Sequence, residues 1–138
     1  MRLSLFFSFL LTLLASSSTL SQVESVWQEV EINLNEGQKW SVHENMLPLL
    51  NQSFELITNA DLQSKGQCKK LAKKLIKLAD NIAKECYLEG DGHAYFHAWY
   101  VPYYNLLKSL RDELFLVDAR TTVEDLRRGI RMYHTYFE

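Results

Sequence analysis

The chain has 138 residues, with 15 lysines and arginines against 17 aspartates and glutamates, and a net charge of −2 at pH 7. This length suits one domain built around one hydrophobic core. A mildly acidic chain lacks the concentrated basic surface that nucleic-acid binding requires, so we expect no nucleic-acid partner.

The N-terminal residues are typical of a secretory signal peptide. Arg2 provides a positive start, residues 3–15 are mainly apolar, and small polar residues precede a cleavage point ahead of Gln22. The apolar run is too short to span a bilayer, and no later stretch is apolar enough to be a membrane span. We therefore predict a signal peptide over residues 1–21, a single domain over 22–138, and a periplasmic or secreted protein.

Apolar residues recur at alternating steps of three and four along four segments, which is the spacing of amphipathic helices. These apolar stripes run over residues 40–57, 68–86, 93–117 and 123–137. No segment alternates with a period of two for long enough to indicate a sheet. Four amphipathic helices with short connections most simply form an all-α protein, an antiparallel up-down four-helix bundle.

Turn-forming residues mark the three connections between these helices. The first is Asn-Ala-Asp at residues 59–61, the second is Glu-Gly-Asp-Gly at 89–92, and the third is the polar segment 118–122. Thr121 and Glu124 have the spacing of a capping box, which predicts that the fourth helix begins there.

The antiparallel order has a consequence for the histidines. The first and third helices begin at the end of the bundle where the second and fourth finish. We therefore expect one end to collect all four histidines and two sulfur-containing residues: His43, His93, His97, His134, Met46 and Cys86.

Two of these histidines belong to a weak internal repeat. His43 precedes Pro48 by five residues, and His97 precedes Pro102 by the same interval. A proline within a helix removes one hydrogen bond and kinks the helix. Because the first and third helices are diagonal neighbours, we expect the two histidines to face each other across the core and to act as a ligand pair.

Imidazole is a common ligand of transition metals and of haem iron, and three interpretations stay open. The aromatic residues between His93 and Tyr104 are suited to enclosing haem b, although they also suit a core. A zinc or copper ion held by His43, His97 and His134, with His93 as a further ligand, is the alternative. The third interpretation is a helical interaction module without a cofactor.

Two short segments also resemble a known family. The ending Arg-Met-Tyr-His-Thr-Tyr-Phe at residues 131–137 resembles the end of the periplasmic cytochrome b562 family, whose last helix carries an axial haem histidine. Residues 44–46, Glu-Asn-Met, are similar to the Asp-Asn-Met that holds the family's axial methionine. The resemblance implies that His134 and Met46 hold haem b, with His43 as an alternative to Met46. It also implies electron transfer to a redox partner protein.

The two cysteines, Cys68 and Cys86, fall on one predicted helix. Eighteen residues at helical rise separate them by about 27 Å, whereas a disulfide joins Cα atoms no more than about 7 Å apart. We therefore expect no disulfide within one chain.

Signatures of catalysis are missing from the sequence. It has no Gly-rich phosphate loop and no His-Glu-x-x-His motif, and we find no nucleophile paired with a base. We therefore predict a binding protein and not an enzyme, with the oligomeric state left open.

Overall fold

The computed structural model describes residues 25–138, so the predicted signal peptide lies outside the described residues. The chain forms a short 3-10 helix followed by four α-helices: η1 (Val26–Glu29), α1 (Leu47–Thr58), α2 (Lys65–Lys84), α3 (Gly90–Asp112) and α4 (Leu116–Tyr136). Within the described residues the only β-type pairing is two isolated bridges. The prediction of an all-α protein is confirmed.

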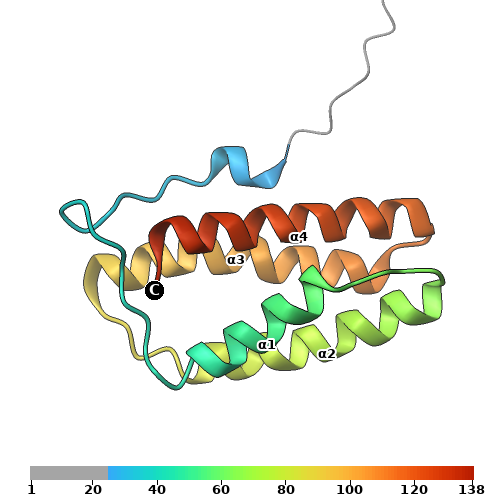
Figure 1. The fold of residues 1–138 in the computed structure, drawn as a ribbon, viewed down its shortest axis with the longest axis horizontal. Helices are drawn as coiled ribbons and strands as arrows, with labels where there is room; N and C mark the ends of the chain where they lie inside the picture. The colour runs from blue at the N-terminus through green and yellow to red at the C-terminus, as the bar shows by residue number, and fades with distance from the viewer. Residues whose placement is uncertain (1–24) are drawn as a thin grey trace, which may run out of the picture.

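The four α-helices alternate in direction and form an up-down bundle (Figure 1). Helix α1 packs against α2 and α4, and α3 packs against the same two helices, so α1 and α3 are diagonal. The predicted topology is therefore confirmed. None of the helices in residues 25–138 is long and apolar enough to cross a membrane.

Aromatic residues of α3 fill the centre of the bundle. Trp99 and Tyr103 are completely buried and stack with their ring centroids 4.9 Å apart. Tyr133 of α4 lies edge-on to Trp99 at 5.2 Å and to Phe54 of α1 at 5.0 Å. These rings pack on one another, as expected for the interpretation in which the aromatic segment is core.

The segment before α1 lies along α4. Trp27 of η1 is buried and donates its indole N–H to the Asp125 carbonyl at 2.7 Å. Its ring presses on Gly129, where an added Cβ would lie only 2.2 Å from a ring carbon. Because no larger residue fits under the indole, glycine at this position lets the N-terminal segment pack closely on the bundle.

The first helix begins later than predicted. Residues 40–46 are not helical, and Trp40 instead forms a bridge to the end of α4, donating to the Tyr136 carbonyl at 2.8 Å and accepting from the Glu138 N–H at 3.0 Å. Pro48 therefore falls in the first turn of α1. Backbone N–H groups in the first turn have no acceptor within the helix, so a proline costs no hydrogen bond there. The predicted helical position of His43 and the predicted kink at Pro48 are wrong.

The last connection is also displaced from its predicted position. Helix α3 ends at Asp112 and α4 begins at Leu116, so the predicted loop at 118–122 is helical. The Thr121 hydroxyl does not cap a helix but donates to the Val117 carbonyl one turn earlier, at 3.1 Å. This bond to the preceding turn satisfies the hydroxyl of a threonine inside a helix. The prediction of a loop at 118–122, which was based on the polar composition of the segment, is wrong.

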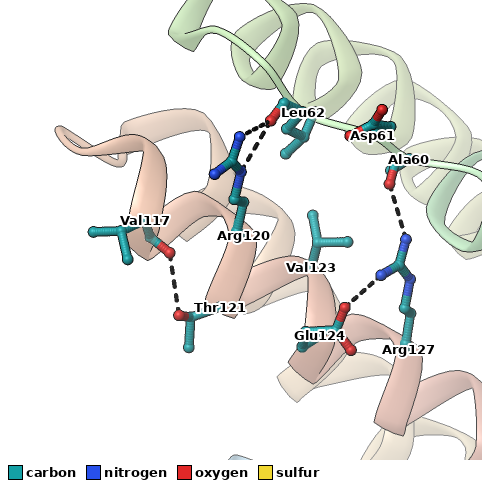
Figure 2. Close-up of a pocket in the computed structure, with 9 residues that line it drawn as sticks. All are labelled: Ala60, Asp61, Leu62, Val117, Arg120, Thr121, Val123, Glu124 and Arg127. Carbon is teal, nitrogen blue, oxygen red and sulfur yellow. Dashed lines mark hydrogen bonds and ion pairs between the residues drawn. The ribbon is translucent and has the colours of Figure 1, made fainter.

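Two arginines of α4 hold the connection between α1 and α2 (Figure 2). Arg120 donates to the Leu62 carbonyl through two nitrogens, at 2.8 and 3.0 Å, and Arg127 donates to the Ala60 carbonyl at 2.9 Å. A surface pocket of about 350 Å³ lies between these contacts. Because both guanidinium groups are engaged by backbone oxygens, we assign this pocket a structural role.

Candidate metal-binding site

The turn between α2 and α3 brings three potential metal ligands together. Helix α2 ends at Lys84, and Cys86 lies in the short connection that follows. Gly90 has a φ of 62°, a left-handed conformation that glycine adopts without strain, and the chain reverses there into α3. His93 lies in the first turn of α3, and His97 lies one turn later on the same face.

The distances between the three side chains are close to those of a metal site. The ligand atoms of Cys86, His93 and His97 all lie within 4.8 Å of one another. The Cys86 Sγ is 3.9 Å from Nδ1 of His93, and the two imidazole centroids are 4.4 Å apart. Tetrahedral zinc with ordinary bond lengths requires an S···N separation of about 3.6 Å. The Cys86–His93 pair would have to close by about 0.3 Å to bind one ion, and a pair of ligand atoms 4.8 Å apart would have to approach by more than about 1 Å through side-chain rotation.

Desolvation and a neighbouring histidine favour the ligand form of His97. Cys86 and His93 are half-buried and His97 is exposed. Partial desolvation, followed by the proximity of His93, lowers the pKa of His97 below its ordinary value of 6.5. His97 therefore stays neutral to lower pH than a free histidine, and a neutral imidazole is the form that binds metal.

His43 lies close to this turn but outside the three-residue group. Its ring is edge-on to Tyr87 at 5.5 Å, and its Nδ1 accepts the Asn45 N–H at 3.3 Å. His43 is half-buried and His97 is exposed. The predicted arrangement, with these two histidines facing each other across the core, is therefore wrong. Metal ligation by His43 stays a prediction.

The two residues implied by the cytochrome resemblance have different surroundings. Met46 is completely buried at the start of α1. His134 is exposed near the end of α4, with its ring edge-on to Phe54 at 5.6 Å and to Tyr133 at 5.4 Å. Both lie at the end of the bundle where α2 finishes and α3 begins, as the topology predicted (Figure 1). Their ligation of haem b stays a prediction.

The structure adds Cys86 to the ligands that the sequence analysis selected. The spacing of His93 and His97, four residues apart on a helix, is a known arrangement for two metal ligands. Cys86 precedes His93 by seven residues across a glycine-containing turn. That Cys-x6-His-x3-His pattern is the signal in the sequence, which predicts Cys86 at the histidine end of the bundle but does not by itself select it as a ligand.

The second cysteine is remote from the site. Cys68 is buried in the first turn of α2, where its thiol contacts the Ser64 carbonyl at 3.2 Å. Both Cys68 and Cys86 are free. The prediction that they do not pair within one chain is confirmed, and Cys86 is left available as a thiolate ligand.

Comparison of the chain with protein-family models, with curated proteins and with solved structures found no match. The assignment of function therefore rests on the geometry and chemistry of the residues themselves.

Proposed function

We propose that this protein binds a transition metal ion, with zinc as the preferred ion, through Cys86, His93 and His97. The observation that carries the proposal is the convergence of one sulfur and two nitrogen ligands within 4.8 Å. Thiolate and imidazole are the ligands that zinc favours, most often in a tetrahedral arrangement.

The backbone positions of the three residues support a site that is arranged for a metal ion, and not a chance proximity of three side chains. His93 and His97 belong to one helix, so their separation is set by the helical backbone. Cys86 is tied to them by a short connection between two packed helices. Ligands that are positioned before the ion arrives lose little conformational entropy on binding.

Three protein ligands leave a tetrahedral ion one open position. The exposed edge at His97 gives an ion a route to the site from solvent. The core lies elsewhere, around the fully buried Trp99 and Tyr103, so we expect the chain to fold without the metal. These features favour reversible binding, as in a metal carrier or buffer, over a structural zinc site or an enzyme.

The experiment is a calorimetric titration of the protein with Zn²⁺. We expect one ion per chain, and an affinity loss of more than about tenfold, the usual effect of even an outer-shell change, for Cys86→Ser, His93→Ala and His97→Ala separately. His134→Ala is the matched control, because His134 is exposed at the same end but outside the group. Wild-type affinity in all three site variants would refute the proposal.

Haem b binding through His134, with Met46 or His43 as the second ligand, is the second candidate. Its support is the resemblance to the cytochrome b562 family and the location of these residues at one end of the bundle. Because Met46 is completely buried, the start of α1 would have to move to admit a macrocycle. Titration with hemin tests this candidate: a saturable one-to-one spectrum that weakens in His134→Ala would favour it, and an unchanged spectrum in that variant would exclude it.

A further inference from the structure

The end of the bundle opposite the metal-binding group carries exposed apolar side chains. Leu114, Phe115 and Val117 are 69%, 65% and 67% exposed, and we call these three residues the apolar tip. Among the large apolar side chains of residues 25–138, only Tyr87 is similarly exposed. Leu116, between them in sequence, packs against the core. The three tip residues are therefore not needed for packing within the chain.

Basic residues lie at the same end of the bundle as the apolar tip. Helix α2 begins where α3 ends (Figure 1), and Lys69 and Lys73 of α2 line a common surface hollow with Arg111 of α3. Basic residues of α2 and α3 at this end include Lys65, Lys69, Lys73, Lys108 and Arg111. We call these five residues the basic collar.

The acids near the tip are fewer and partly engaged. Asp112 is ion-paired with Arg111 at 2.7 Å, and the Glu113 carboxylate accepts the Thr122 hydroxyl at 3.3 Å. Asp118 is exposed in the first turn of α4, and two further acids, Asp61 and Glu124, line a pocket together with Val117 of the tip. The collar together with Lys70 of α2 and Arg120 of α4 places seven basic residues at this end against these five acids, although the chain as a whole is acidic.

The size of the tip argues against a second protein chain as its occupant. Three side chains that are two-thirds exposed present on the order of a few hundred Å² of apolar surface, whereas a stable protein interface buries about 800 Å² per partner. A small apolar projection with basic residues behind it is complementary to the surface of a lipid bilayer, which has an apolar interior beneath charged headgroups. There, apolar side chains enter the acyl boundary and lysines and arginines remain at the headgroups.

We propose that the apolar tip inserts into the surface of an anionic lipid bilayer, with the basic collar contacting the lipid phosphates. The 20 residues of α2 span about 30 Å, so the bundle would hold Cys86, His93 and His97 away from the membrane and open to solution. This inference is independent of the metal, because it rests on residues at the opposite end.

The test is hydrogen exchange of the full-length protein with and without vesicles. We expect slower exchange in residues 113–119 with vesicles of phosphatidylglycerol and phosphatidylcholine, but not with phosphatidylcholine alone. This readout is local to the tip, so apolar residues elsewhere in the chain do not affect it. No protection in 113–119, or equal protection by both vesicles, would overturn the proposal. Protection that grows with protein concentration in the absence of lipid would instead show a second copy as the occupant.

Substitutions in the apolar tip provide a second test of the same proposal. The double substitution Leu114→Ser with Phe115→Ser should abolish the protection and lower the fraction of protein that sediments with anionic vesicles by several-fold. Folding is not at risk, because Phe115 is the N-cap of α4 and serine is a preferred N-cap residue. Val101→Ser is the matched control, because Val101 is half-exposed on α3 away from the tip. Equal sedimentation of the double variant, with protection of 113–119 retained, would overturn the proposal.

Discussion

The Cys86 thiol lies 3.9 Å from Nδ1 of His93, across the turn that joins α2 to α3. A thiol and an imidazole at this separation need only small side-chain rotations to bind one ion, and His97 supplies a third ligand atom within 4.8 Å. The three residues come from a single helical hairpin. The proposed metal site therefore does not require the other two helices to contribute a ligand.

Alkylation should distinguish the two cysteines. We expect Cys86, which is half-buried, to react readily with iodoacetamide in the metal-free protein and to be protected by one equivalent of Zn²⁺. Cys68 is only 3% exposed and should react slowly in both states, because access limits its reactivity. Mass analysis of digested protein measures both rates. If zinc left the rate at Cys86 unchanged, the thiolate would not be a ligand.

Zinc affinity should fall as the pH is lowered from 7 to 5. Protons compete with the ion for the imidazoles and the thiolate, so binding weakens as each ligand becomes protonated. Because the pKa of His97 is lowered, its proton competes only at lower pH than that of an ordinary histidine. Calorimetric titrations at several pH values measure the dependence. His97→Ala should reduce its steepness, and an unchanged slope would show that His97 does not bind the ion.

Gly129→Ala should destabilise the protein strongly. The added Cβ would lie 2.2 Å from Cζ2 of Trp27, so the buried indole must leave its position. Loss of a buried tryptophan contact is worth about 3–5 kcal/mol, and we expect a loss of free energy of unfolding near the lower end of that range. Urea denaturation followed by tryptophan fluorescence measures it.

The control for Gly129→Ala is Gly66→Ala in α2. An added Cβ at Gly66 has no atom closer than 3.9 Å, and alanine in a helix is favoured over glycine by about 1 kcal/mol. This substitution should therefore leave stability equal or higher. Similar behaviour of the two variants would mean that Trp27 does not pack on Gly129.

Arg120→Lys should loosen the connection between α1 and α2. Arg120 donates two N–H groups to the Leu62 carbonyl, and lysine cannot reproduce this forked geometry (Figure 2). We expect the free energy of unfolding to fall by up to about 1.5–3 kcal/mol, the range for hydrogen bonds that involve a charged group, and hydrogen exchange over residues 59–64 to become faster. Arg131→Lys, an exposed position on the same helix, should change neither quantity. Unchanged exchange in Arg120→Lys would show that the contact does not hold the connection.

The sequence by itself determined the helical architecture. Apolar residues at helical spacing placed four amphipathic segments, and the short connections between them required antiparallel neighbours. That order is enough to bring His93, His97 and the end of α4 to one end of the bundle, because it depends only on local periodicity and on chain connectivity. The separation of Cys68 and Cys86 followed from helical rise alone.

The tertiary structure decided the features that depend on contacts between distant residues. Trp40 lies on a continuous apolar spacing, yet hydrogen bonds to Tyr136 and Glu138 hold it extended and delay the start of α1. The convergence of Cys86, His93 and His97 depends on how the backbone turns at Gly90, and apolar periodicity does not encode that conformation. Local propensity is a weak influence that non-local hydrogen bonds and packing override, so the helical segments were predictable whereas their boundaries and the position of Cys86 relative to His93 were not.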